Sequence, residues 1–295
     1  MSLENKIKKV AKAFEGKLGV AVKHLGTGEE AFVNGNDLFP TASVFKVPVI
    51  VELYRQVESG RIRLNRKITL KEYDKVPGSG VLRELNPGLM ITVQDLATLM
   101  IIISDNTATD IIFNLVGKEN INKTLRKLGL EKTKVVANCR DLLFGLYGLD
   151  DINPEERTIE LFRRRTRSRS FNPNSWTLRV ENNNVTTPRE MLRLLEMIES
   201  GEAASQASCN AIIETMKKCQ TDNCRIPKYL PRNKVEMARK TGNLPGIRPD
   251  VGIIYLLDKG ECYILCCFTM DAADDYAAEE AIAAVSKLVY DHFTA

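Results

Sequence analysis

The feature that most constrains the fold is the stretch over residues 43–58, "SVFKVPVIVELYRQVE", which is apolar around nearly a whole helical circumference. A helix with apolar residues on all sides has to be enclosed by other parts of the protein. Pro48 falls in its first turns, where a missing N–H costs least. The sequence therefore predicts a central buried helix within a sizeable core.

Length and composition are consistent with such a core. The chain has 295 residues, of which 44% are hydrophobic and 27% charged, as in ordinary globular proteins. A net charge of +4 is too small to indicate a nucleic-acid partner. No apolar segment reaches the length of a membrane span. We therefore expect that the protein neither binds nucleic acid nor spans a membrane.

The N-terminus and the cysteines bear on localisation. "MSLENKIKKVAKAFEGK" is charged from residue 4 and has no apolar signal core. Seven cysteines, an odd number, fit reduced thiols better than a disulfide framework. Cys219 and Cys224 have no second Cys or His pair at zinc spacing, so we expect no metal and no cofactor. The chain as it stands reads as cytoplasmic, or as extracytoplasmic if a native signal was removed.

Periodicity along the chain predicts strands at both ends of a helical middle. An amphipathic helix over 4–15 precedes a hairpin over 17–35, and three strands and a helix over 274–291 make up the last third. Helical patterns recur at about 92–103, 105–117, 119–128, 188–200 and 203–218. We predict an α/β (α+β) fold in a single domain, 1–295. Its antiparallel sheet comes from about 1–42 and 220–295, and its helical part from about 43–219.

Residues 139–185 fit no regular pattern, and we interpret them as a lid-like excursion. Its arginine run, Arg163–Arg169, has two interpretations: attraction of anionic substrates or cell-wall polymer, or a solvated basic loop. Trp176, the only tryptophan, lies in the same segment and is interpreted as a loop anchor.

Ser43 and Lys46 are the first candidates for chemistry. At positions i and i+3 of a helix they share one face. The helix N-terminus supplies free N–H groups and partial positive charge, and apolar neighbours lower the pKa of Lys46. Ser43 is then a nucleophile and Lys46 its proton acceptor. The alternative is a lysine at the helix edge whose ammonium extends to solvent, and the spacing alone does not decide.

Two further motifs follow in the chain. Ser104-Asp105-Asn106 falls between two helical segments, and Lys240-Thr241-Gly242 ends a predicted strand. Singly, each has a structural explanation as a helix cap or a strand end. Together and in this order, the three motifs resemble the serine penicillin-recognising enzymes, and among them the class A β-lactamases. The resemblance covers nearly the whole chain, including the layout of strands and helices and the "TTP" of residues 186–188.

The resemblance implies a role for each matching position. In the catalytic group, Ser43 attacks the acyl carbonyl and Lys46 shuttles its proton. Ser104 passes a proton to the departing amine, and Lys240 tunes Ser104.

A second group of matching positions would bind the substrate. Asn106 would hold the amide side chain of the substrate, and Thr241 its carboxylate. The backbone N–H groups of Ser43 and of Asn243, which follows Gly242, would form the oxyanion hole.

Two departures weaken parts of the match. Class A β-lactamases use a glutamate in a Glu-x-x-Leu-Asn segment to activate the deacylating water, and 139–185 lacks that segment. Counting back from Pro188 leads near Phe171, where no carboxylate stands. The omega-loop region is therefore rebuilt. Glutamates that could substitute for the missing base are Glu155, Glu156, Glu160 and Glu181. The alternative is that they are solvated charges of a loop.

The second departure concerns the substrate carboxylate. Val251 precedes the glycine of the next strand, Gly252, where relatives often carry an arginine. Arg248, in the preceding turn, is the candidate substitute.

These observations favour a serine hydrolase that forms an acyl-enzyme on Ser43 and hydrolyses a β-lactam or related amide. Without a base to activate the deacylating water, hydrolysis would be slow. One alternative is a DD-peptidase, amidase or esterase acting on a non-β-lactam acyl substrate. Another is a binding protein that stays acylated and senses β-lactams. The partner is in each case a small-molecule or peptide acyl substrate, and the sequence does not indicate an oligomeric state.

Overall fold

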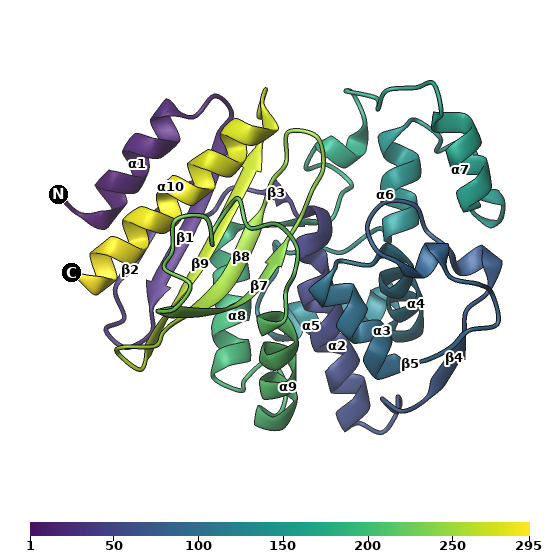
Figure 1. Cartoon of the computed structure of the whole chain (residues 1–295), viewed down its shortest axis with the longest axis horizontal. Helices are drawn as coiled ribbons and strands as arrows, with labels where there is room; N and C mark the ends of the chain where they lie inside the picture. The colour runs from purple at the N-terminus through teal and green to yellow at the C-terminus, as the bar shows by residue number, and fades with distance from the viewer.

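A five-stranded antiparallel sheet joins the two ends of the chain (Figure 1). A computed structural model describes residues 1–295. The strand order is β2-β1-β9-β8-β7, so the N-terminal β1 lies beside the C-terminal β9. The strands are β1 (Lys17–His24), β2 (Glu30–Val33), β7 (Val235–Thr241), β8 (Asp250–Leu256) and β9 (Glu261–Met270). The predicted antiparallel sheet from both ends of the sequence is confirmed.

Alternation along the strands gives the sheet two buried faces. Val20 and Val22 of β1 pack in a cluster with Ile7 and Ile282, which belong to α1 (Leu3–Ala13) and α10 (Asp275–Thr294). Ala21, between them, joins the larger core on the opposite face. Figure 1 shows α1 and α10 side by side on the outer face, with the other helices beyond the inner one.

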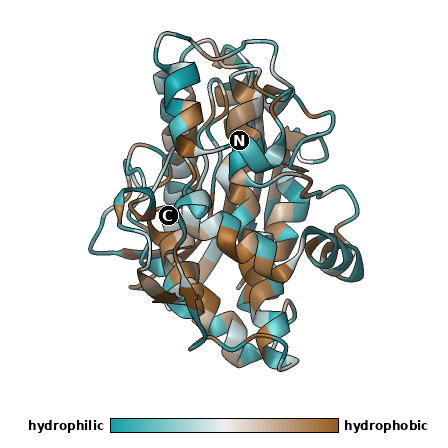
Figure 2. Cartoon of the chain, turned by 90° about the vertical axis from the view of Figure 1, so that its right-hand side faces the viewer, coloured by the Kyte–Doolittle hydropathy of each residue, from teal (hydrophilic) through white to brown (hydrophobic).

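The predicted central helix is α2 (Lys46–Glu58), and its side chains are almost all buried. It shares a cluster of 46 buried residues with the inner sheet face and the surrounding helices. These are α3 (Val93–Ile102), α4 (Asn106–Val116), α5 (Lys118–Lys127), α8 (Pro188–Glu199) and α9 (Gln206–Lys217). Figure 2 shows hydrophobic residues gathered on the inner elements and hydrophilic ones along the peripheral loops.

Two details differ from the prediction for this region. Residues Ala42–Phe45, which include Ser43, form a 3-10 turn, and the α-helix itself begins at Lys46. Short pairings also occur outside the main sheet. β3 (Phe39–Pro40) pairs with β6 (Val185–Thr186), and β4 (Lys67–Thr69) with β5 (Met90–Thr92).

The excursion over 139–185 is more regular than its sequence indicates. It contains α6 (Cys139–Leu146) and α7 (Ile159–Thr166), capped by the side chains of Asn138 and Thr158. Each helix spans about two turns, too few for apolar periodicity to be recognisable. Phe144, at the centre of a small cluster of its own, packs with Phe162. The segment is therefore an ordered excursion with two short helices that the sequence pattern does not predict.

The remaining sequence expectations concern the surface and the thiols. The arginines of the 163–169 run are exposed, on the last turn of α7 and just after it, and Arg163 pairs with Glu84 at 2.9 Å. All seven cysteines are free thiols. None of the helices combines the length and the apolar character needed to cross a bilayer.

Candidate active site

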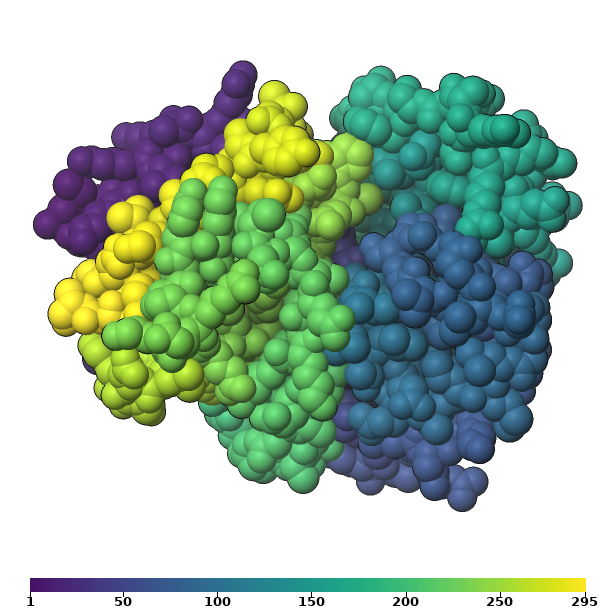
Figure 3. All heavy atoms as spheres, viewed as in Figure 1, coloured from purple at the N-terminus to yellow at the C-terminus, as the bar shows by residue number.

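Ser43 lies in the wall of a cavity of about 150 Å³ between the sheet edge and the helical part. The residue before it, Ala42, has φ +41°, a left-handed conformation that directs the chain into the 3-10 turn ahead of α2. Figure 3 shows a furrow between the green and yellow C-terminal segments and the blue and teal segments that precede them in the chain, with purple atoms visible at its bottom. The cavity is lined by Ala42, Ser43, Phe45, Gly78, Ser79, Ser104, Asn106, Cys139, Leu142, Leu143, Thr221, Thr241, Gly242, Asn243 and Leu244.

Lys46 is fully buried behind this wall, so its ammonium does not reach solvent and the solvent-exposed alternative is wrong. Nζ donates to Ser104 O at 2.8 Å, to Ser104 Oγ at 3.0 Å and to Asn106 Oδ1 at 2.9 Å. Burial lowers the pKa of Lys46, because the charged form loses its hydration. A lysine in this state can give up its proton and act as a base.

Ser104 connects the helical part to the sheet. It lies between α3 and α4 with φ +56°, and this conformation turns both its carbonyl and its hydroxyl towards Lys46. Asp105, the next residue, caps α4 by accepting from the N–H of Ala108. The capping explanation thus holds for Asp105, whereas Ser104 faces the cavity.

Lys240 approaches the same hydroxyl from the other side. Its Nζ, fully buried at the end of β7, donates to Ser104 Oγ at 3.0 Å and to Thr241 O at 2.7 Å. Burial, together with the nearby charge of Lys46, lowers the pKa of Lys240 to about 7. Two ammonium groups that share one buried hydroxyl repel each other, and this repulsion favours the loss of a proton from one of them.

Gly242 allows the end of β7 to approach the turn that carries Ser43. A Cβ at this position would lie 2.9 Å from both the backbone N of Ser43 and the Cβ of Ala42. No side chain other than hydrogen fits without displacing one of them. The neighbouring Thr241 faces the cavity, and its Oγ1 lies 2.7 Å from Oγ1 of Thr221.

The structure does not bring Arg248 to the cavity. Its guanidinium pairs with Asp275, lies 3.4 Å from Glu279 and donates to the carbonyl of Leu244. The turn directs this side chain towards the first turns of α10. The prediction that Arg248 belongs to the substrate-binding site is therefore corrected.

A different arginine, Arg225, holds the segment that follows the end of β7. It is fully buried and donates to Gly242 O at 2.9 Å, to Pro249 O at 3.0 Å and to the side chain of Asn243. Sequence reasoning missed it because it stands in the aperiodic stretch "TDNCRIP", where nothing local indicates burial.

The excursion contributes Cys139, Leu142 and Leu143, all from α6, to the cavity wall. Asp110 of α4 holds the start of α6 by accepting from the N–H of Cys139 at 2.7 Å and from that of Arg140 at 3.0 Å. Sequence reasoning missed Cys139, because the search for a water-activating group followed the spacing from Pro188.

The carboxylate candidates lie elsewhere. Glu155, Glu156, Glu160 and Glu181 are exposed, and none lines the Ser43 cavity. Phe171, near which the spacing placed the water-activating group, borders a separate hollow of about 800 Å³ instead.

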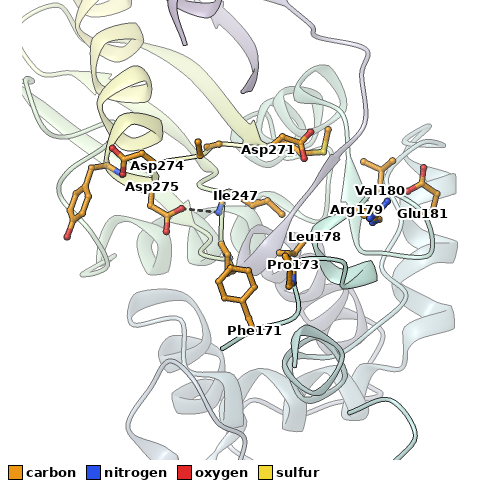
Figure 4. A pocket seen from close by; sticks show the side chains of 16 residues that line it. Phe171, Pro173, Leu178, Arg179, Val180, Glu181, Ile247, Asp271, Asp274 and Asp275 are labelled. Atoms are coloured by element: carbon orange, nitrogen blue, oxygen red, sulfur yellow. Dashed lines mark hydrogen bonds between the residues drawn. The ribbon is translucent and has the colours of Figure 1, made fainter. Parts of the chain in front are cut away.

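That second hollow lies between the excursion and the start of α10 (Figure 4). Phe171, Pro173 and Leu178 form one side of it, and Ile247 and Asp275 the other. Asp275 Oδ1 accepts from the N–H of Gly246 at 3.0 Å, which fixes the turn between β7 and β8.

One group of side chains has metal-ligand chemistry. Ligand atoms of Asp222, Cys224 and Glu279 lie within 4.8 Å of one another. Both carboxylates already pair with Arg225, at 2.8 and 3.1 Å, and Glu279 also lies 3.4 Å from Arg248, so two guanidinium groups balance their charge.

Known proteins resemble the chain along nearly its whole length. A model of the β-lactamase enzyme family matches residues 2–293. β-Lactamase VEB-1 of Pseudomonas aeruginosa is 22% identical over 99% of this chain and 90% of its own. A β-lactamase structure from Sphaerobacter thermophilus has TM-score 0.80 at 29% identity, covering 99% and 97% of the two chains.

A third relative has been solved as an acyl-enzyme. It is a mutant of PBP-A in complex with penicillin G, with TM-score 0.78 at 25% identity over 99% of this chain and 96% of that one. With a family model matched from end to end and the same fold in solved β-lactamases, this chain belongs to the β-lactamase enzyme family.

Proposed function

We propose that this protein is a serine hydrolase of the class A β-lactamase type, acylated on Ser43 by β-lactams. The observation that carries the proposal is the hydrogen-bonded series Lys46–Ser104–Lys240 behind the Ser43 cavity. It supplies a desolvated amine one helical turn from a partly exposed serine. It also supplies a hydroxyl that can return the proton.

The proposed acylation step uses these positions. Unprotonated Lys46 accepts the hydroxyl proton as Ser43 Oγ attacks the carbonyl carbon of the lactam. When the C–N bond of the tetrahedral intermediate breaks, the leaving nitrogen takes a proton from Ser104 Oγ. Ser104 recovers its proton from Lys46, with which it is hydrogen-bonded. The cycle ends with an ester on Ser43 and no net change in protons.

The developing oxyanion would lie between two backbone N–H groups. Those of Ser43 and Asn243 do not donate to another backbone carbonyl, and Gly242 brings the two segments together. In other enzymes one such donor contributes about 3–4 kcal/mol to lowering the barrier. Arg225 supports this arrangement because it holds the carbonyl of Gly242 and the side chain of Asn243.

Substrate recognition is assigned to polar groups of the same wall. Thr241 and Thr221 offer adjacent hydroxyls for a substrate carboxylate, and positive charge on Lys240 favours an anion there. Asn106 is oriented by Lys46 and by the carbonyl of Pro77, to which its Nδ2 donates at 2.9 Å. The preferred substrate is thus a small acyl compound that bears a carboxylate.

The test is the intact mass of the protein after mixing with benzylpenicillin, followed from seconds to hours. We expect one penicilloyl adduct in the wild type and none in Ser43→Ala, with loss of penicillin from solution as the adduct turns over. No adduct and no consumption of penicillin would contradict the proposal.

A second function, a DD-peptidase or a β-lactam sensor, is favoured by one observation. No residue that lines the cavity carries a carboxylate, so the ester on Ser43 would persist. Release of D-alanine from an acyl-D-alanyl-D-alanine peptide, measured beside penicillin hydrolysis, distinguishes the peptidase. A permanent adduct with neither activity indicates the sensor.

A further inference from the structure

The wall of the Ser43 cavity contains fifteen residues and not one aspartate or glutamate. Hydrolysis of an ester on Ser43 needs a water molecule and a group that takes its proton. The only side chain of the wall with an acidic proton of ordinary pKa near 9 is the thiol of Cys139. The group that faces the ester from the excursion is therefore a thiol.

Cys139 is held rigidly at this place. It is the first residue of α6, only 4% exposed, and its backbone N–H donates to Asp110. Burial raises the pKa of the Cys139 thiol far above its ordinary value, and the charge of Lys46 offsets only part of this effect. The thiol stays protonated at neutral pH, so it cannot take a proton from water.

The carboxylates behind the wall are already engaged. Asp110 accepts two backbone N–H groups at the start of α6, one on each oxygen. Asp105 accepts from Ala108 with one oxygen and from Val81 and Leu82 with the other. Neither lines the cavity, so neither is positioned to activate a water molecule beside Ser43.

We propose that Cys139 determines the lifetime of the acyl-enzyme: its neutral thiol occupies the part of the wall from which a base would activate the deacylating water. This inference rests on the proposed acylation of Ser43. It implies that the wild-type protein acylates readily and releases its acyl group slowly.

An aspartate at position 139 would supply the missing base. Its side chain is close to cysteine in size. Lys46 next to it would favour the ionised form, whereas the neighbouring carboxylate of Asp110 would raise its pKa. Water would attack the ester carbonyl while the aspartate takes its proton. The acyl–oxygen bond then breaks, and the proton held by the aspartate passes to Ser43 Oγ as the free acid leaves.

The experiment compares Cys139→Asp with Cys139→Asn, two variants of the same shape that differ in the ability to accept a proton. Benzylpenicillin is the probe, and intact mass gives the rates of adduct formation and adduct loss separately. We expect adduct loss at least ten-fold faster in Cys139→Asp than in Cys139→Asn. In the aspartate variant alone the rate should rise with pH as the carboxylate ionises.

Three outcomes would overturn the inference. The first is adduct loss at equal rates in the two variants when both acylate. The second is release of the acyl group by the wild type within seconds, which overturns the inference but not the proposed function. Absence of any adduct on wild-type Ser43, with no consumption of penicillin, would remove the proposed function and the inference with it.

A measurement on the wild type decides the question if the variants do not fold. Hydroxylamine attacks esters without needing a base to remove its proton beforehand. We expect it to shorten the adduct lifetime in proportion to its concentration, with formation of the hydroxamate. No effect of hydroxylamine would mean that the ester is shielded rather than without a base, and would overturn the proposal.

Discussion

Lys46 shows how far a single residue can be interpreted from sequence. A lysine within an apolar helical stretch indicates either a side chain that extends to solvent or a desolvated base. The structure decides for burial, because the Nζ of Lys46 is hydrogen-bonded to Ser104 and Asn106 inside the protein. The geometry that supports catalysis is also the one that costs stability, since a buried charge loses its hydration.

Lys240 makes this cost measurable as a function of pH. Its pKa is about 7 in the folded protein, against 10.5 for an ordinary lysine. Between these values the unfolded chain binds a proton that the folded protein does not, so the free energy of unfolding rises with pH across this interval. Below about pH 7 the folded protein carries the buried charge, and the destabilisation is greatest.

We therefore expect Lys240→Met to be more stable than the wild type at pH 6–7, by about 1–3 kcal/mol, and to acylate more slowly. Urea unfolding at several pH values measures the first effect and penicillin adduct formation the second. The stability difference should shrink towards pH 10. A difference that is independent of pH would show that the gain comes from packing rather than from the lost charge.

Arg225 illustrates a residue that acts through others. Its guanidinium holds two carbonyls of the segment after β7 and balances the carboxylates of Asp222 and Glu279. Removing it leaves these groups buried or half-buried without their partner, and such a loss costs about 3–5 kcal/mol in proteins.

For Arg225→Met we expect a loss of stability of this order and acylation slowed more than ten-fold, because Gly242 and Asn243 lose their support. Urea unfolding and adduct formation are the two measurements. Arg164→Met, at an exposed position of α7, is the matched control and should change neither. Normal acylation in a stable Arg225→Met protein would contradict the assigned positioning role.

At the scale of elements, helix α6 connects the excursion to the site. The sequence indicates no helix here because eight residues are too few for a periodic pattern. Its start is determined by two acceptors, the side chain of Asn138 for the N–H of Asp141 and that of Asp110 for the two preceding N–H groups. One of these acceptors is local in sequence and the other belongs to α4.

Asp110→Ala should therefore loosen α6. Two buried N–H groups would lose their acceptor, at a cost of about 1–3 kcal/mol each before relaxation. Urea unfolding measures the total, and hydrogen exchange at the amides of Cys139 and Arg140 locates it. Asp95→Ala, which removes an exposed carboxylate at the start of α3, is the control and should cost less than about 1 kcal/mol. Unchanged exchange at Cys139 would contradict the role of Asp110.

At the scale of the whole molecule, the two ends of the chain meet in one sheet around a common core. The largest buried cluster joins Ile253 and Ile264 of the sheet with Val47 of α2 and Leu96 of α3. Such continuity leaves no boundary at which the sheet part and the helical part would separate.

We expect one cooperative unfolding transition, in keeping with the predicted single domain. The only tryptophan, Trp176, lies in the excursion and packs partly buried against the main core, so its fluorescence reports on that segment. The midpoint of the fluorescence change in urea should coincide with the midpoint of the change in far-ultraviolet circular dichroism. An earlier fluorescence transition would show that the excursion unfolds by itself.

The sequence by itself determined the central helix, the strands at both ends and the three motifs, because each depends on contacts or periodicities within a few residues. The tertiary structure alone decided that Arg248 turns away from the cavity, that Arg225 supports the strand end, and that Cys139 faces the cavity beside Lys46. Both depend on backbone segments far apart in the chain that approach one another only after folding. The energy of a buried charge or thiol is set by those distant neighbours, so no local pattern announces it.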